Sequence, residues 1–179
     1  MAQIKLQADG LNLADTFAFS GTVTGAGGIT EADQWRLTAS ITTDVDPIAS
    51  NLERVDDASF EKIGTGMSVS SGYWTFPSTG LYMVRTDVGC VTDEDDNVRI
   101  DVYATIDDST YDLVARAFTG GYSGTTGNTA NTTNYVNVTD VSNVKVSFAA
   151  GSIGASSYFQ ADTDYNFTSF TFIRLGDSQ

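Results

Sequence analysis

The sequence predicts an all-β protein made of many short strands. Apolar and polar residues alternate with a period of two along several segments, most clearly along Val98–Ile106. Turn signals separate these segments, among them Gly64–Gly66, Ser70–Gly72 and Asp107–Ser109. The composition agrees, because 24 Thr and 17 Ser stand beside 17 Gly, a mixture that disfavours helices. A β-sandwich or a barrel is the expected architecture.

The expected strands can be followed in order along the chain. They are an extended run over 17–23, then alternating segments over 36–41, 81–91, 98–106, 144–148 and 165–175. In the second of these, Leu37, Ala39 and Ile41 alternate with polar residues. No apolar stripe with a period of 3.6 residues extends beyond about two helical turns. We therefore expect no long helix.

Two of these strands carry apolar residues on both sides. In Tyr165–Leu175, Phe170 and Phe172 face one way, while Phe167 and Ile173 face the other. Leu81–Val91 shows the same two-sided pattern. An antiparallel sheet with one wet face has a single apolar side, so the second face of this sheet must be covered as well. Another part of this chain or a neighbouring subunit would cover it, and we favour the subunit.

Size and charge limit the possible partners. The chain has 179 residues and 19.0 kDa, roughly the size of one domain. Its formal charge is −14, with 9 basic and 23 acidic residues, so nucleic acid and anionic lipid would repel it. No segment approaches the ~18 apolar residues of a membrane span. We expect no nucleic-acid partner and no insertion into a membrane.

The residue counts also exclude several chemistries. The sequence has no histidine, which excludes a Ser-His-Asp triad and a histidine zinc helix. Cys90 is the single cysteine, so no internal disulfide can form, and its mid-strand position predicts a small buried residue. We expect no enzyme activity and no cofactor.

The first 33 residues differ in composition from the rest of the chain. Ile4, Leu6, Phe17 and Phe19 lie among Thr and Gly, and the segment closes with a glycine cluster at 25–28. One interpretation is the first hairpin of the sandwich. The other is an extended N-terminal arm, residues 1–33, whose apolar residues anchor the protein by adding strands to a partner.

Two motifs resemble the globular heads of the C1q and tumour-necrosis-factor family. The first is Gly72-Tyr73-Trp74-Thr75-Phe76-Pro77-Ser78-Thr79-Gly80-Leu81-Tyr82, and the second is the closing aromatic strand Asn166–Ile173. The resemblance covers roughly residues 34–176. It implies a C1q/TNF-like jelly-roll β-sandwich over 34–179 that assembles as a homotrimer. The residues expected at the trimer interface or core are Tyr82, Val84, Phe167, Phe170, Phe172 and Ile173.

The opening of the chain resembles the starts of virion surface proteins of tailed, especially marine, bacteriophages. The similar segments are Gln3–Leu6 and Asp15–Gly25, and the start lacks the apolar run of a secretion signal. We expect a protein made in the host bacterial cytoplasm and carried on the virion, as a capsid decoration or head fibre beside other virion proteins. A tail-fibre-type head that recognises host surface glycan is the alternative, and a carbohydrate-active enzyme is a third, disfavoured one.

Three further segments offer ligand-binding candidates. Asp93, Asp95 and Asp96 form a carboxylate-rich loop with oxygens for Ca²⁺, although a solvated loop explains them better. Tyr122 lies within a Gly-rich stretch, inside a long surface loop expected over 119–133, and loop aromatics are candidates for ligand contact. A glycosidase would need two facing carboxyl groups, and the spacing selects no pair from Glu53, Asp56, Asp57 and Glu61.

The remaining aromatic residues invite a sugar-binding interpretation, because aromatic faces stack on pyranose rings. They are Trp35, Tyr73, Trp74, Tyr103, Tyr111, Tyr122 and Tyr158. Trp74 lies in the family-like strand, where one of the two alternating faces must be core. We therefore assign Trp74 to the core.

Overall fold

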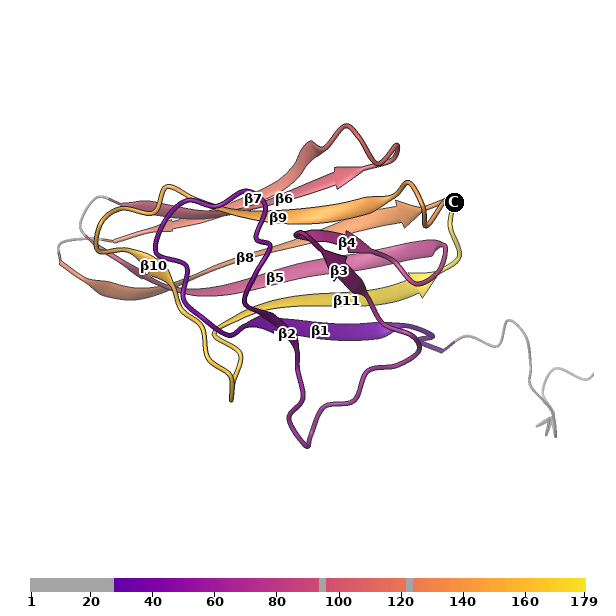
Figure 1. The fold of residues 1–179 in the computed structure, drawn as a ribbon, viewed down its shortest axis with the longest axis horizontal. Helices are drawn as coiled ribbons and strands as arrows, with labels where there is room; N and C mark the ends of the chain where they lie inside the picture. Colours follow the sequence, from indigo (N-terminus) through magenta and orange to yellow (C-terminus); the bar gives the residue numbers. More distant parts are fainter. Residues whose placement is uncertain (1–27, 94–95, 122–123) are drawn as a thin grey trace, which may run out of the picture.

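The computed structural model describes residues 28–93, 96–121 and 124–179. These residues form eleven strands in two antiparallel sheets that pack face to face (Figure 1). The described part of the chain contains no helix, and hence no helix that could cross a membrane. The prediction of an all-β sandwich is confirmed.

The first sheet has six strands, and β5 (Gly80–Thr92) runs along its whole length. The other strands are β1 (Ala32–Leu37), β2 (Leu52–Arg54), β8 (Thr126–Val138), β10 (Tyr158–Phe159) and β11 (Thr168–Gly176). The order is β2-β1-β11-β5-β8. The short β10 pairs with the far end of β5, beyond the start of β11.

The second sheet has five strands in the order β3-β4-β9-β6-β7. They are β3 (Ser68–Ser70), β4 (Tyr73–Thr75), β6 (Asn97–Thr105), β7 (Asp112–Gly120) and β9 (Lys145–Gly151). The chain crosses repeatedly from one sheet to the other, so that sequence neighbours such as β8 and β9 lie in different sheets. This is the connectivity expected of a jelly roll.

The core lies between the sheets and is centred on Trp74, which is fully buried. Its ring centroid lies 5.2 Å from Trp35, 5.1 Å from Phe172 and 5.9 Å from both Phe148 and Phe170. Aromatic pairs at these separations stabilise a core beyond their buried area, by about 0.5–1.5 kcal/mol each. The prediction that Trp74 belongs to the core is confirmed.

The expected alternation along 98–106 is confirmed within β6 but ends early. Val98, Ile100 and Val102 face the core and are buried. Ile106 is instead 80% exposed, because β6 ends at Thr105 and Ile106 begins the turn to β7. The strand expected over 36–41 likewise stops at Leu37, and Ile41 forms only an isolated bridge with the short strand β10.

The prediction of a long loop over 119–133 is wrong. β7 extends to Gly120, and β8 begins at Thr126. β8 pairs with β5 in unbroken register from Thr126 opposite Thr92 to Val138 opposite Gly80. The polar composition of this segment resembles that of a loop, but its many Thr residues have good strand propensity. The long strand β5 supplies the backbone hydrogen-bond partners that make it a strand.

The described N-terminal residues join the sandwich before the boundary expected at 33/34. β1 begins at Ala32, whose register partner is Ile173 near the end of β11. The backbone carbonyl of Glu31 accepts from the N–H of Arg174 at 2.9 Å, and its carboxylate accepts from the N–H of Gly66. The described start and the C-terminus therefore lie at one end of the sandwich (Figure 1).

Candidate functional site

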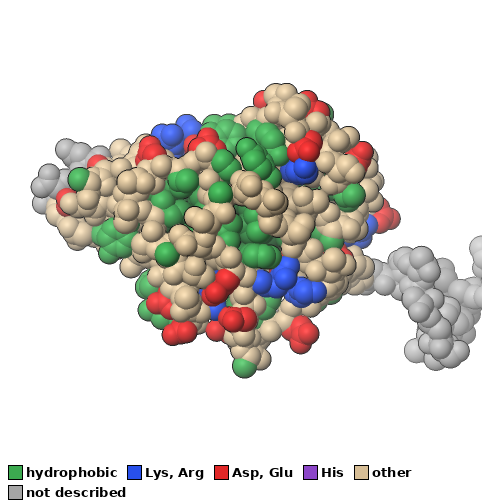
Figure 2. All heavy atoms as spheres, viewed as in Figure 1, with side chains coloured by type: hydrophobic (Ala, Val, Ile, Leu, Met, Phe, Trp, Pro, Cys, Tyr) green, Lys and Arg blue, Asp and Glu red, His purple; other side chains and the backbone are tan. Residues whose placement is uncertain are grey.

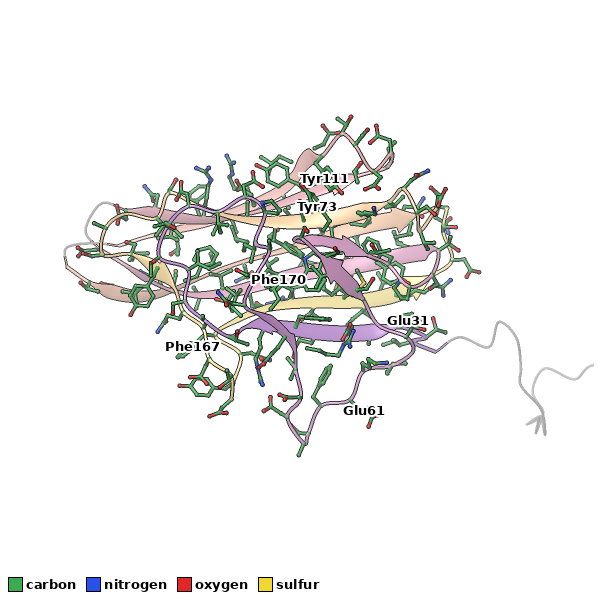
Figure 3. The ribbon with its side chains drawn as sticks, viewed as in Figure 1. Glu31, Glu61, Tyr73, Tyr111, Phe167 and Phe170 are labelled. Carbon is green, nitrogen blue, oxygen red and sulfur yellow. The ribbon has the colours of Figure 1, made fainter. Side chains whose placement is uncertain are left out.

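The six residues expected at a trimer interface or core divide between two faces of the first sheet. Tyr82, Val84, Phe170 and Phe172 point between the sheets and are buried within the chain. Phe167 and Ile173 lie on the outer face and are half-buried. Figure 3 shows the two positions, with Phe170 inside the sandwich and Phe167 at its lower margin. Among these six residues, only Phe167 and Ile173 offer apolar surface to a partner.

The outer face of the first sheet carries a continuous row of apolar side chains. The bridge and strand registers place Ile63 beside Ala32, Ala32 beside Ile173, Ile173 beside Met83, and Met83 beside Tyr135. Residues opposite each other in antiparallel strands project from the same side of the sheet. Ile63 is 45% exposed and Tyr135 is 63% exposed. We call Ile63, Ala32, Ile173, Met83 and Tyr135 the apolar row.

The next row along the same face is polar, so the apolar surface has a clear boundary. It consists of Gln34, Thr171, Arg85 and Thr133, in the same cross-strand register. Arg85 also pairs with Asp87 on this face, and both side chains are partly exposed. Within the described residues, the two ends of the apolar row, Ile63 and Tyr135, are exposed, and Ala32, Ile173 and Met83 between them are half-buried.

A second apolar surface lies at the edge of the sandwich formed by β7 and β8. In the described structure each of these strands pairs on one side only, β7 with β6 and β8 with β5. A groove of about 490 Å³ runs along this edge, lined by Ile106, Val114 and Tyr135 among others. Phe118, on the outer face of β7, is 68% exposed. Unpaired strand edges with apolar side chains are sites of association.

The acidic residues considered as a hydrolase pair have a structural role. The buried Arg36 guanidinium donates to Glu53, Asp56 and Asp57 at 2.7, 2.6 and 2.9 Å. Desolvation acts to lower the pKa of Arg36, but the carboxylates of Glu53 and Asp57 outweigh it and raise the pKa. These three carboxylates surround one cation instead of facing each other across a cleft, as glycoside hydrolysis requires.

A second buried ionic group connects β1, β2 and the segment before β3. The Asp33 carboxylate accepts from Arg54 at 2.9 and 3.1 Å, from the Trp35 indole N–H at 2.9 Å and from the Met67 N–H at 2.7 Å. A buried carboxylate with this many donors is fully satisfied. It stabilises the fold and has no lone pair turned toward a ligand.

The outer face of the second sheet holds a polar hollow with two tyrosines. Its volume is about 480 Å³, and it is lined by Ser70, Ser71, Tyr73, Thr75, Asp108, Ser109, Tyr111 and Lys145. The ring centroids of Tyr73 and Tyr111 lie 4.9 Å apart with an interplanar angle of 49°. Figure 3 shows the two rings side by side at this face. We call this site the tyrosine hollow.

The turn between β6 and β7 forms one wall of the tyrosine hollow and is held firmly. The Asp107 carboxylate accepts from the N–H groups of Thr110 and Ser109 and from the Thr105 hydroxyl, and these hydrogen bonds lower the pKa of Asp107 well below its ordinary value. The Lys145 ammonium group donates to the Asp108 carboxylate at 2.5 Å. The backbone N–H of Asp108 donates to the carbonyl of Asn143. The wall is therefore pre-formed.

The tyrosine hydroxyl nearest this ion pair stays protonated. Burial, and then the negative charge of Asp108, raise the pKa of Tyr111 to about 12. The Tyr111 hydroxyl is therefore a hydrogen-bond donor at all ordinary pH values. Lys145 and Asp108 carry opposite charges, so this pair adds no net charge to the hollow.

Several of the sequence-predicted residues lie outside the described residues. These are Tyr122, Asp95 and the anchoring residues Ile4, Leu6, Phe17 and Phe19. Of the calcium candidates that are described, the Asp96 carboxylate accepts from the Ser157 hydroxyl and the Asp93 carboxylate accepts from Thr125. Within the described residues no group of three acidic, histidine or cysteine side chains could hold a metal ion.

Some residues of these sites were not identified from the sequence. Ile63, Met83 and Tyr135 complete the apolar row, and their grouping depends on a register that joins distant segments. Tyr73 and Tyr111 were both sugar-binding candidates, but nothing in the sequence pairs them. Asp108 and Lys145 were not among the sugar-binding candidates, although the turn signal at 107–109 did indicate an exposed turn between two strands.

Comparison with known proteins identifies the fold only through structure. No protein-family model matches the sequence, and no curated protein matches it. Among solved structures, murine APRIL at pH 5.0 has a TM-score of 0.60 at 11% identity, covering 81% of this chain and 98% of that one. The Eiger TNF of S. frugiperda has a TM-score of 0.60 at 10% identity, covering 85% of this chain and 96% of that one.

These identities are too low to transfer an activity, but the overlap extends over more than four fifths of this chain and almost the whole of the other two. The strand order of both sheets, the aromatic core and this overlap agree with one another. The chain therefore has the TNF-like jelly-roll fold.

Proposed function

We propose that this chain is a non-enzymatic structural protein of a phage virion, assembled as a homotrimer on the particle surface. The observation that carries the trimer is the apolar row on the outer face of the first sheet, whose two ends, Ile63 and Tyr135, are exposed. Exposed apolar surface of this kind, rimmed by polar residues, is typical of an interaction site. A second copy of the chain is the partner that is always present.

The position of the apolar surfaces favours a closed ring over a two-fold dimer. The apolar row lies on a sheet face, whereas Ile106, Val114 and Phe118 lie along the β7/β8 edge. When two different surfaces of one subunit meet, the contact is head-to-tail, and such contacts form a ring where the rotation between neighbouring subunits closes. The resemblance to the C1q and tumour-necrosis-factor heads implies three subunits per ring.

The proposed attachment uses the part of the expected arm, residues 1–33, that precedes β1. The chain enters the sandwich at Ala32, at the end where β11 also finishes. The C-terminal end of β5 and the start of β8 lie at the opposite end, where Thr92 and Thr126 are register partners. An arm bound to a capsid would therefore hold these two strand ends away from the particle. Three arms on one trimer would multiply the affinity of a single arm.

The virion role is tested with an antibody against the purified protein and gradient-purified phage particles. The proposal predicts that the protein sediments with capsids, and that a variant lacking residues 1–28 remains a soluble trimer but no longer binds them. Absence of the protein from particles contradicts the virion role. Failure of the truncated variant to fold would instead identify residues 1–28 as the first hairpin of the sandwich.

The alternative function is a receptor-binding head for host surface glycan. The specific observation in its favour is the tyrosine hollow, where two aromatic rings adjoin hydroxyl groups and an ion pair. Binding of fluorescent trimer to host cells, without binding to isolated capsids, would favour this alternative over capsid decoration. The reverse result would favour decoration.

A further inference from the structure

We propose that the tyrosine hollow is a binding site for neutral hexopyranose units of a glycan. This inference deepens the glycan-recognising alternative above and rests on it, but it does not depend on attachment to a capsid. Five features of the hollow carry the proposal: its aromatic wall, its polar lining, its balance of charge, its pre-formed loop and its position on the fold.

The aromatic wall fits the apolar side of a sugar ring. Tyr73 lies on β4 and is 38% exposed. Tyr111, in the connection between β6 and β7, packs against it with the two ring centroids 4.9 Å apart. The rings meet at 49°, so they form an open angle instead of closing on each other. The π face of an aromatic ring carries partial negative charge, which attracts the polarised C–H groups of a pyranose.

The polar lining fits the hydroxyl groups of the sugar. The hydroxyls of Ser70, Ser71, Thr75 and Ser109 line the hollow, and each can donate and accept a hydrogen bond. A volume of about 480 Å³ lies within the range of roughly 300–1,000 Å³ usual for small-ligand sites. Aromatic surface with a few convergent polar groups is the usual composition of such a site.

The charges in the hollow favour a neutral ligand. Lys145 is the basic residue of the lining, and its ammonium group is already paired with Asp108. The whole chain carries a formal charge of −14, which repels anionic sugars. The carboxylate of a sialic or uronic acid would find no unpaired cation in the lining and would be repelled by the negative charge of the chain. A neutral hexose meets no such repulsion.

The hollow is organised before any ligand binds. Ser71 and Asp108 both line it and both have left-handed backbones, with φ of 52° and 56°. Such conformations are costly for residues other than glycine, and they persist only where the surroundings impose them. Here Asp107 and the carbonyl of Asn143 fix the turn at Asp108. A pre-formed site loses less entropy when it binds.

The position of the hollow leaves it accessible in the proposed assembly. Tyr73 and Lys145 lie on the outer face of the second sheet, whereas the apolar row lies on the outer face of the first. In the view of Figure 2, hydrophobic side chains gather across the middle of the molecule, with charged side chains mostly around them. A trimer packed through the apolar row and the β7/β8 edge leaves β4 and β9, which carry Tyr73 and Lys145, outside both contacts. It would display three hollows, which raises avidity for a repeating glycan.

The test uses the full-length protein on an array of neutral and acidic glycans, followed by fluorescence titration with the best neutral oligosaccharide. The proposal predicts binding to neutral hexose glycans, with a loss of about tenfold or more in affinity for Tyr111→Ala and for Tyr73→Ala. Tyr165→Ala is the matched control, since Tyr165 is 55% exposed and lies outside the hollow, and it should bind like the wild type.

A conservative variant tests the charge argument without disturbing the turn. Asp108→Asn keeps a residue that tolerates a positive φ but leaves Lys145 unpaired. We expect this variant to gain binding to acidic glycans relative to neutral ones, with an unchanged thermal unfolding midpoint.

The outcomes separate the site from the function. If the wild type binds neutral glycans and both tyrosine variants bind equally well, the hollow is not the site, while glycan recognition stands. Binding to acidic glycans alone overturns the proposed ligand class. If the wild type binds no glycan on the array, both this inference and the receptor-binding alternative fail.

Discussion

Replacement of Tyr135 by threonine should weaken the trimer without unfolding the protomer. Tyr135 ends the apolar row and is 63% exposed in the single chain. A tyrosine side chain contributes on the order of 200 Å² of contact surface, so about 130 Å² of it remains for a partner to bury. At about 25 cal/mol per Å², that surface is worth at most about 3 kcal/mol per subunit, or roughly a hundredfold in affinity for each contact.

The assay is sedimentation velocity over a dilution series, with thermal unfolding measured in parallel. Threonine is already frequent in β8 and has good strand propensity, so the protomer should keep its unfolding midpoint once dissociation is taken into account. Tyr73→Thr is the matched control, because Tyr73 is 38% exposed on β4, on the outer face of the second sheet and away from the β7/β8 edge. If both variants dissociate over the same concentration range, or neither does, the apolar row is not the interface.

Three further predictions concern the fold and its charged groups. Arg36→Met leaves three carboxylates without their common cation and should destabilise the fold by about 2–4 kcal/mol in urea denaturation, against less than about 1 kcal/mol for Arg85→Met at an exposed pair. At Asp101, burial acts to raise the pKa, but hydrogen bonds from Arg116 and Arg99 outweigh it and lower the pKa. The stability that this lowered pKa supplies is fully present above the pKa of an unfolded aspartate, about 3.9, and is lost as the pH falls below that value. The thermal unfolding midpoint of Asp101→Asn should therefore depend less on pH in this acidic range than that of the wild type. Burial raises the pKa of the Cys90 thiol to about 11, so iodoacetamide should modify it rapidly only in denaturant, and fast native labelling would contradict its burial.

The sequence predicted the fold class well because its strongest signals are local. The alternation along 98–105 and the aromatic pattern around Trp74 reflect neighbouring residues on a single strand, which periodicity reads directly. The two-sided apolar pattern of 81–91 and 165–175 also proved informative, because it marks the strands that become β5 and β11 in the centre of the first sheet.

The sites were harder to predict because they depend on register between distant segments. Ile63 and Tyr135 belong to one row only after β1, β11 and β5 are aligned between them. β8 was missed for the same reason, because its polar sequence is typical of a loop and its strand structure depends on backbone pairing with the distant strand β5. Arg36 alternates with apolar residues in the sequence, and nothing in that pattern indicates that it is buried beside Asp56 and Asp57, which lie about 20 residues further along the chain.

The mass of the wild-type protein in solution is the most direct test of the proposed homotrimer. Sedimentation equilibrium at micromolar concentration should give a single species with three times the 19.0 kDa mass of the chain. The apolar row would then be buried between subunits, and each protomer would be incomplete on its own. A stable, monodisperse species with the mass of one chain over the same range would contradict the account.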